Sequence, residues 1–303
     1  MLDVVIVSFR SRDLLSPCLM SLRAHPPAAR ARVWVVDNAS RDGTVEMVRS
    51  EFPEVELLES DTNLGFSVAN NAAIRRGRAP YVLALNPDTR VTDGALDRLL
   101  DLMETDSSIG MAGCRLDRGD GTLDHAARRS FPTPIGALGH FSGLGRRAKT
   151  PRWLSQYRAP WIENGPVDAV NGAFMLMRRS ALDEVGLFDE GYWMYMEDLD
   201  LCYRLAQAGW TTWYEPSVTV FHVKGGSSGR YRSPRLNYAF HYGMYRFYRT
   251  HYAPRRSRVV NAAVYAGIAV KLALSTARGA LRALDAKRRR QLSASAAPAP
   301  SQR

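Results

Sequence analysis

The chain has 303 residues, of which 46% are hydrophobic and 23% are charged, and this predicts a globular protein with one large α/β domain or two small ones. Its three cysteines lie far apart, which argues against a disulfide framework and fits a reducing compartment. The net charge of +11 is unevenly distributed along the chain. Residues 224–303 hold 17 Lys and Arg against one acid, whereas residues 1–223 hold 24 basic against 29 acidic residues. We therefore expect an anionic partner for the basic tail, either nucleic acid or a membrane.

The first half of the chain alternates continuous apolar segments with helical patterns. The expected elements are, in order, a strand at Asp3–Phe9, a helix at Arg12–Leu22, a strand at Arg32–Asp37, a helix from Thr44, a strand at Val55–Leu58, a helix at Ser67–Arg76, a strand at Tyr81–Leu85 and a helix at Asp93–Glu104. This alternation predicts an α/β fold with a mostly parallel central sheet and helices on both faces. Ligands of such sheets bind beyond the carboxyl ends of the strands. No basic segment precedes the first strand, so no signal peptide is expected.

Polar residues follow the second expected strand and precede the third expected helix. Asp37 ends the strand, where its carboxylate can accept hydrogen bonds from a base or a ribose, or alternatively close an Asx-turn. Gly65 precedes a helix that holds Asn70 and Asn71, and it permits a close approach of the backbone to a ligand. Neither pattern is specific on its own.

The expected strand at Tyr81–Leu85 ends in Asn86-Pro87-Asp88. Asn86 and Asp88 are two residues apart and can reach one site, where a carboxylate can hold a divalent ion against a diphosphate. The alternative is a type I turn with Pro87 at its second position.

The second half of the chain begins with a segment of poor periodicity. Residues 117–165 are rich in Gly, Pro and Arg, which predicts loops over the mouth of an active site. Order returns with an apolar segment at Val167–Met177, a short helix at Ala181–Val185, a helix at Glu197–Ala208, and strands at Trp210–Tyr214 and Val218–Phe221.

Three acids, Glu197, Asp198 and Asp200, open the predicted helix at Glu197–Ala208. The helix dipole favours negative charge there, so capping alone explains one or two of them. Trp193 and Tyr195 precede the acids and indicate a walled pocket, which can raise the basicity of a carboxylate. His222 leaves the last expected strand beside a Gly/Ser-rich loop. A lone histidine is commonly structural, but this setting suits a metal or a phosphate.

Taken in chain order, from about residue 2 to about residue 229, these motifs resemble those of the family 2 glycosyltransferases, which have the GT-A fold. The similarity is greatest to the rhamnosyltransferase-like subgroup, which uses deoxythymidine- or uridine-diphosphate sugars. The motifs are Val-Ser-Phe-Arg, Val-Asp-Asn-Ala-Ser, Asn-Leu-Gly-Phe, Asn-Pro-Asp and Glu-Asp-x-Asp-Leu-Cys-x-Arg. One departure is that Asn86-Pro87-Asp88 replaces the common Asp-x-Asp, so Asp88 is the one anionic metal ligand expected there.

The resemblance implies an inverting, metal-dependent transfer of rhamnose or a related deoxyhexose from a dTDP- or UDP-sugar. The acceptor would be a hydroxyl of a glycan or of a polyprenyl-linked intermediate in cell-envelope polysaccharide synthesis. Asp198 would be the general base, with Glu197 as the second candidate, and Asp88 and His222 would hold Mg²⁺ or Mn²⁺. The other implied contacts to the donor are Ser8, Phe9, Arg10, Asp37 and Asn38 near the nucleotide, Gly65 and Asn71 near the ribose and diphosphate, and Asn86 beside the metal.

The basic tail has an aromatic part and an apolar part. Asn237–Tyr252 is rich in Tyr and Phe, and Val259–Leu284 is rich in Ala, Val and Leu. The uncharged run Val259–Val270 is about half the length that a spanning helix needs, so we expect an interfacial helix on an anionic membrane. The enzyme would then be cytoplasmic and peripheral to the inner face of the plasma membrane. The alternative is a helix packed on the enzyme's own core or on a second subunit in a homodimer.

The expected organisation has four parts. Residues 1–116 form the nucleotide-sugar-binding half, residues 117–229 the acceptor-binding and catalytic half, residues 230–290 the basic helical tail, and residues 291–303 a disordered terminus. Two other functions compete. A nucleotidyltransferase usually has a Gly-rich loop after its first strand, which Ser8–Arg12 lacks. A nucleic-acid-binding protein would leave the acidic cluster and the Asn-Pro-Asp turn unexplained, so no nucleic acid partner is expected.

Overall fold

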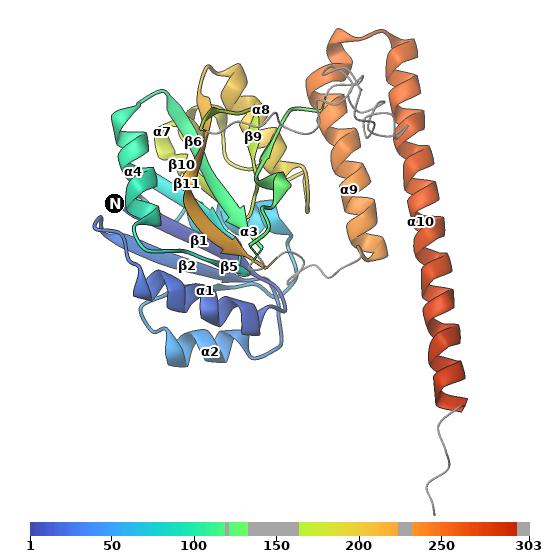
Figure 1. The fold of residues 1–303 in the computed structure, drawn as a ribbon. Coiled ribbons are helices and arrows are strands. Elements are labelled where there is room, and N and C mark those ends of the chain that lie inside the picture. The colour runs from blue at the N-terminus through green and yellow to red at the C-terminus, as the bar shows by residue number, and fades with distance from the viewer. Residues whose placement is uncertain (119–120, 133–163, 224–231, 296–303) are drawn as a thin grey trace, which may run out of the picture. The chain divides into compact units, whose positions relative to one another are not determined.

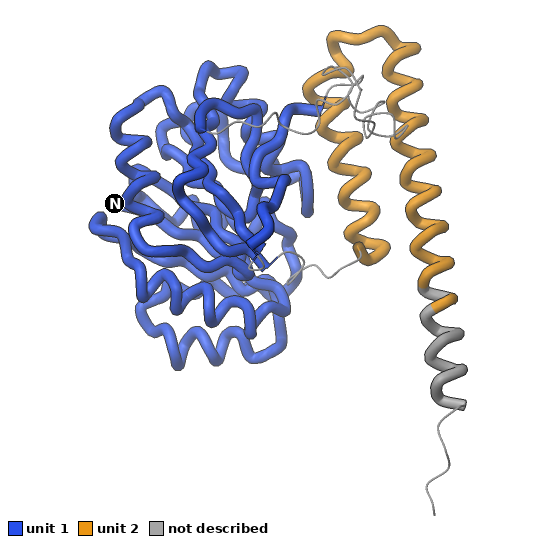
Figure 2. Tube along the Cα trace, in the orientation of Figure 1, with its two compact units in different colours: residues 1–230 blue, residues 231–303 orange. Residues whose placement is uncertain are grey.

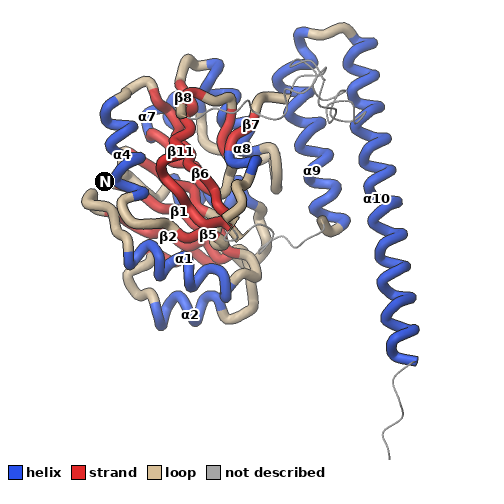
Figure 3. Tube along the Cα trace, viewed as in Figure 1, coloured by secondary structure: helices blue, strands red, loops and turns tan. Residues whose placement is uncertain are grey.

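The computed structural model describes residues 1–118, 121–132, 164–223 and 232–295 (Figure 1). The chain divides into two compact units, residues 1–230 and residues 231–303 (Figure 2). The first unit is a mixed α/β sheet with its helices, and the second is a pair of helices (Figure 3).

The central sheet of the first unit has the order β3-β2-β1-β4-β10-β6-β11-β5, and β8 pairs with β11 outside this path. Its strands are β1 (Leu2–Ser8), β2 (Ala31–Asp37), β3 (Glu56–Glu59), β4 (Tyr81–Leu85), β5 (Thr89–Arg90), β6 (Ile109–Asp117), β8 (Gly165–Pro166), β10 (Phe174–Arg178) and β11 (Thr211–His222). A small second sheet pairs β7 (Arg128–Arg129) with β9 (Ala169–Val170). The helices are α1 (Arg12–Ala24), α2 (Thr44–Glu51), α3 (Phe66–Ile74), α4 (Ala95–Thr105), α7 (Arg179–Val185) and α8 (Glu197–Gln207).

The prediction of a mostly parallel sheet is confirmed. β1 pairs in parallel with β2 and β4, and β11 pairs in parallel with β6. β10 lies between β4 and β6 and is antiparallel to both. The two strands expected at Trp210–Tyr214 and Val218–Phe221 form one strand, β11. Its register against β6 shifts between Glu215 and Thr219, next to Pro216, which has no N–H to donate to a ladder.

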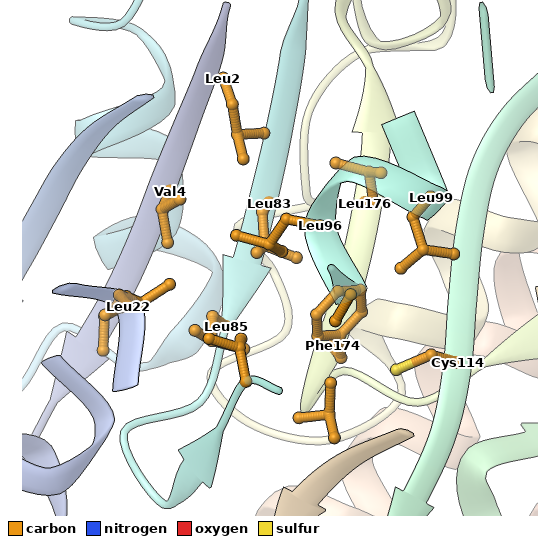
Figure 4. Packing of buried hydrophobic residues seen from close by; sticks show 14 of the residues in the cluster. Leu2, Val4, Leu22, Leu83, Leu85, Leu96, Leu99, Cys114, Phe174 and Leu176 are labelled. Carbon is orange, nitrogen blue, oxygen red and sulfur yellow. The ribbon is translucent and has the colours of Figure 1, made fainter. Parts of the chain in front are cut away.

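Alternating side chains of the strands divide between two faces of the sheet. Val4 and Ile6 of β1 belong to the large core with α1, α2 and α4, whereas Val5 between them is buried but lies outside that core. Leu83, Leu96 and Phe174 are among the side chains of this core (Figure 4). On the other face, Ala69 and Ala73 of α3 are fully buried. Because both faces are covered, the polar groups that matter lie at the strand ends.

The second unit consists of α9 (Pro234–Phe247), a π-helical turn (Tyr248–Tyr252), a 3₁₀ turn (Ala253–Arg255) and α10 (Arg258–Ser295). Aromatic rings join the two helices: the centroid of Tyr265 lies 5.2 Å from that of Tyr245 and 5.7 Å from that of Tyr248. The Tyr248 hydroxyl donates to Asn261 Oδ1 at 2.7 Å. The 25 residues Arg258–Arg282 are long and apolar enough to cross a membrane, by length and composition alone. This segment therefore has the length that a membrane-spanning helix needs, whereas the uncharged run Val259–Val270 alone does not.

Candidate functional site

Backbone strain is concentrated at two places in the described part of the chain. Five non-glycine residues there have positive φ: Arg10, Ala39 and Arg41 follow β1 and β2, and Tyr195 and Met196 precede α8. Each such residue costs on the order of 1–3 kcal/mol, and the surrounding fold must hold it in place. The strained residues lie beside the predicted nucleotide contacts and beside the predicted base.

The carboxyl ends of β1 and β2 form the first part of the site. Asp37 is 4% exposed; its Oδ2 accepts from the Ser40 amide at 3.1 Å, and its Oδ1 is buried without a hydrogen-bond partner. Phe9 is 37% exposed, and the Arg10 guanidinium lies 5.2 Å from its ring centroid. Ser8 is buried and pairs with Ser11, Oγ to Oγ, at 2.9 Å. An open acceptor beside an exposed ring is suited to a hydrogen-bonding, stacking ligand.

Three other predicted donor contacts are engaged by the protein itself. Asn38 accepts from the Leu64 amide at 2.9 Å and donates to the Gly65 carbonyl at 3.1 Å. Gly65 has φ of 85°, and a Cβ there would lie 2.3 Å from the Trp193 carbonyl oxygen. Asn71 donates to the Phe188 carbonyl at 2.8 Å and accepts from its amide at 3.2 Å. These residues hold the loops around the site, and their contact with a donor stays a prediction.

The Asn-Pro-Asp segment and the end of β11 form the second part. The Asn86 carbonyl accepts from the Thr89 amide at 3.3 Å, as in the predicted turn, and the Asp88 carbonyl accepts from the Val223 amide at 2.9 Å. This pairing brings His222 Nε2 to 3.4 Å from Asp88 Oδ1. Both side chains are buried. The structure thus joins two residues that are 134 positions apart in the sequence.

A third residue, Asp124, lies on the other side of the histidine ring. His222 Nδ1 is 3.8 Å from Asp124 Oδ2. Burial lowers the pKa of His222, but the carboxylates of Asp124 and Asp88 outweigh it and raise that pKa to about 9. Asp124 has no recognisable signal in the sequence, because it follows a Gly-containing turn with no periodicity around it.

Asp88 and His222 fit a magnesium or manganese ion that is shared with a diphosphate. Such ions are bound by one or two protein ligands together with phosphate oxygens and water. Over the described ranges, no group of three His, Cys, Asp or Glu side chains could hold a metal by itself. The remaining coordination positions would therefore fall to the donor and to water.

The three acids at the start of α8 differ in their surroundings. Asp198 Oδ2 is ion-paired with Arg129 and accepts from the Gly172 amide at 3.0 Å, and its Oδ1 accepts from the Leu199 amide at 2.8 Å. Asp200 binds Arg204 Nε at 2.8 Å, one turn along the helix. Asp198 and Asp200 are thus both held by cationic or backbone donors.

Glu197 is the exception among these acids. It is 5% exposed, and its Oε2 is buried without a hydrogen-bond partner. Burial, and secondly the charge of Asp198, raise the pKa of Glu197 to about 8. A buried carboxyl with an open oxygen and a pKa near neutrality has the properties of a general acid or base.

The turn Asn171–Ala173 connects these parts. The Ala173 carbonyl accepts from the Asn86 amide at 3.0 Å, and the Gly172 amide donates to Asp198. Asn171 Nδ2 donates to the Ala126 carbonyl at 3.2 Å, two residues after Asp124. One three-residue turn therefore contacts the Asn-Pro-Asp segment, the Asp124 loop and the start of α8.

The sequence of the chain matches a known protein family. The family described as "Glycosyl transferase family 2" matches residues 3–186, which is more than half of the chain. The chain belongs to this family. The predicted resemblance is confirmed, and the protein is a glycosyltransferase.

Two relatives of this family 2 glycosyltransferase are named rhamnosyltransferases. An N-acetylglucosaminyl-diphospho-decaprenol L-rhamnosyltransferase of Mycobacterium tuberculosis is 35% identical over 256 residues, which cover 80% of this chain and 81% of the relative. Rhamnosyltransferase WbbL of Escherichia coli is 27% identical over 230 residues, which cover 73% of this chain and 83% of the relative. The mannosyltransferase PcManGT of Pyrobaculum calidifontis, solved with GDP-Man and Mn²⁺, has a TM-score of 0.57 at 17% identity and covers 93% of this chain and 80% of its own. This likeness confirms the predicted GT-A fold.

Within this glycosyltransferase, Arg129 is a second residue that the sequence analysis missed. It lies on β7, 69 residues before its partner Asp198, and it also donates to the Val170 carbonyl at 2.8 Å. Its position depends on the pairing of β7 with β9, two strands of two residues each. Strands this short leave no periodic signal in a sequence.

Proposed function

We propose that this family 2 glycosyltransferase moves rhamnose or a related deoxyhexose from a dTDP- or UDP-sugar to a hydroxyl of a lipid-linked glycan. The reaction belongs to cell-envelope polysaccharide synthesis and inverts the anomeric carbon. The match to the mycobacterial L-rhamnosyltransferase over four fifths of both chains supports the sugar and the lipid-linked acceptor. The observation that carries the chemistry is the Asn171–Ala173 turn, because it joins the Asp88 segment to the acids of α8.

In this proposal the nucleotide binds at the ends of β1 and β2. The open Oδ1 of Asp37 accepts a hydrogen bond from an N–H of the base or from a ribose hydroxyl. The exposed ring of Phe9 offers a stacking surface beside it. Uracil, thymine and guanine each carry a ring N–H that a carboxylate oxygen can accept, whereas adenine and cytosine carry none, so Asp37 is compatible with a UDP- or dTDP-linked donor.

Asp88 and His222 would hold Mg²⁺ or Mn²⁺ on the diphosphate of the donor. When bound, the ion would supply positive charge to the leaving nucleoside diphosphate. The Mn²⁺ in the solved mannosyltransferase of the same fold supports a divalent ion. Metal binding must displace the proton that His222 carries when its pKa is about 9, so binding strengthens as the pH rises.

We assign the general base to Glu197, which the sequence analysis placed second to Asp198. The oxygens of Asp198 are engaged by Arg129 and by two backbone amides, whereas Glu197 retains an open oxygen. As the acceptor oxygen bonds to the anomeric carbon, the bond from that carbon to the diphosphate oxygen breaks. The hydroxyl proton passes to Glu197, and the nucleoside diphosphate leaves. Asp198 and Arg129 then serve to hold the start of α8.

We also propose that the second unit binds an anionic membrane at the inner face, where a lipid-linked acceptor is available. Several apolar side chains of α10 are exposed, among them Val259 at 79%, Val270 at 57% and Leu281 at 62%. The tail from residue 224 has a formal charge of +16, counted as 17 basic residues less one acid. Near an anionic surface each basic residue contributes about 1 kcal/mol, and salt weakens the attraction. Exposed apolar surface together with positive charge favours a lipid surface over nucleic acid.

The decisive experiment is a transfer assay with purified full-length protein and a synthetic N-acetylglucosaminyl-diphospho-polyprenol acceptor. We expect transfer from dTDP-rhamnose in Mn²⁺ or Mg²⁺, inversion at the anomeric carbon by NMR, and loss of activity in excess chelator. Asp88→Ala and His222→Ala should each weaken the metal dependence of donor binding. Transfer from GDP-sugars alone would overturn the donor assignment, and full activity in excess chelator would overturn the metal site. Release of pyrophosphate from a nucleoside triphosphate and a sugar 1-phosphate would favour a nucleotidyltransferase instead.

A further inference from the structure

Asp124 is a buried carboxylate in a loop that follows β6. The Asp124 amide donates to the Leu116 carbonyl at 2.8 Å, and the Arg118 amide donates to the Thr122 carbonyl at 3.0 Å, so the chain turns back on the end of β6. Asp124 is 1% exposed. A carboxylate removed from water in this way requires a compensating arrangement of donors.

The two oxygens of Asp124 face different groups. Oδ1 accepts from the Ala126 amide at 3.1 Å, which caps the short helix His125–Ala127, and from Arg118 Nη2 at 3.2 Å. Oδ2 faces His222 Nδ1 at 3.8 Å. The cap and the ion pair account for Oδ1, but neither requires that Oδ2 face an imidazole.

The imidazole of His222 lies between two carboxylates. Its Nε2 is 3.4 Å from Asp88 Oδ1, and its Nδ1 faces Asp124. Two backbone pairings support this arrangement: β5 pairs Thr89 with His222, and β6 pairs Asp117 with Phe221. The ring is thus placed by β11, and its two edges are defined by acids from two separate loops.

We infer that Asp124 is a positioning residue for His222: its carboxylate holds the proton on Nδ1 and turns Nε2 towards Asp88 and the metal. A partner on the far nitrogen fixes the tautomer and the orientation of a ligating imidazole. This inference rests on the proposed metal site. It assigns to Asp124 a role in metal affinity and leaves direct coordination to Asp88 and His222.

The test compares the affinity of the protein for dTDP in Mn²⁺ and in excess chelator, by calorimetry. The ratio of the two affinities measures the metal site, whereas the affinity in chelator reports an intact nucleotide site and fold. In Asp124→Asn the amide oxygen can still cap Ala126, but its NH₂ group then faces His222 Nδ1. We expect the ratio to fall 10- to 100-fold, the usual loss when a partner of a ligating histidine is changed. Asp124→Ser keeps a capping oxygen and should show the same loss, and Asp124→Glu should restore part of the ratio.

Glu215→Gln is the matched control. Glu215 is also a buried carboxylate, lies on the same strand as His222, and accepts from a backbone amide, that of Ser217 at 3.0 Å. The ratio of dTDP affinities in Mn²⁺ and in chelator should be the same for Glu215→Gln as for the wild type. The inference would be overturned if Asp124→Asn and Asp124→Ser both kept the wild-type ratio of dTDP affinities while His222→Ala lowered that ratio to one. Asp124 would then only cap the short helix His125–Ala127. A ratio of one in the wild type would overturn the metal site itself, and the inference with it.

Discussion

The variant Glu197→Gln distinguishes Glu197 from Asp198 as the general base. If Glu197 is the base, a rise in pH should increase the activity of the wild type and decrease its stability, because both depend on the ionisation of Glu197. The acceptor proton can pass only to ionised Glu197. Wild-type kcat should therefore rise about tenfold per pH unit up to about pH 8, the pKa of Glu197, and level off above it. The variant should lose roughly 10²- to 10⁴-fold in kcat, the usual contribution of a general base, and keep its donor affinity.

The stability of the wild type should change in the other direction. The pKa of Glu197 is raised from 4.5 to about 8, so the folded state keeps its proton where the unfolded state has lost it. The stabilising contribution of that proton is complete below pH 4.5 and is lost as the pH rises to about 8. At about 1.4 kcal/mol per pH unit, the difference amounts to an upper limit of about 5 kcal/mol. Glutamine does not ionise, so the variant should gain stability relative to the wild type across this window.

The assay is chemical denaturation of both proteins at pH 5, 7 and 9, alongside transfer kinetics at the same pH values. Asp198→Asn is the companion variant. It leaves Arg129 without its buried carboxylate partner, so we expect a loss of roughly 3–5 kcal/mol in the free energy of unfolding. If Glu197→Gln retains wild-type kcat, and its stability relative to the wild type does not change between pH 5 and pH 9, the reasoning is refuted and Asp198 becomes the base.

Three further predictions concern other parts of the chain. Gly65→Ala should destabilise the protein by roughly 2–4 kcal/mol in denaturation, because the new Cβ would meet the Trp193 carbonyl. Gly94→Ala is the control: Gly94 has φ of 66° but open space around it, so the change should cost about 1–2 kcal/mol. Equal losses in the two variants would show that the contact with Trp193 does not matter. Asp3→Ala should cost roughly 3–5 kcal/mol, since it removes the carboxylate partner of Arg179 and the acceptor of the Ala79 amide; a loss below 1 kcal/mol would show that water replaces the carboxylate. In flotation, full-length protein should bind anionic vesicles at low salt, and a version cut after residue 229 should not. Equal binding by both versions, or no binding by either, would contradict membrane docking.

The sequence predicted the parts of the fold that have a long, regular pattern. The apolar run of β1 and the amphipathic pattern of α4 are found within two residues of their expected ends, because burial of one face or both imposes a periodicity. β5 and β7 have two residues each, too few for any period, and the bulge in β11 divides one strand into two apparent ones. The helix α10 extends past the charged residue Lys271, which ended the apolar run on which the sequence analysis relied.

For the site, sequence reasoning paired Asp88 with His222 but missed the other partners of its residues. Asp88 and His222 were expected together, and the structure brings them to 3.4 Å. Asp124 and Arg129 were missed because each contacts a residue far along the chain, His222 and Asp198 respectively. The order of preference between Asp198 and Glu197 could not be read from adjacent acids. It depends on which side chain meets an arginine, and that contact is set by tertiary structure.

The turn Asn171–Ala173 has a mechanical consequence. It is bonded on one side to Asn86 and on another to Asp198, and β10 continues from it as an antiparallel strand between β4 and β6. The Asn-Pro-Asp segment and the start of α8 are thus both hydrogen-bonded to one turn that leads directly into a strand in the middle of the sheet. In the proposed mechanism this turn sets the span between the metal site and the acids of α8, so variation in the surrounding loops could change the sugar or the acceptor while that span stays constant.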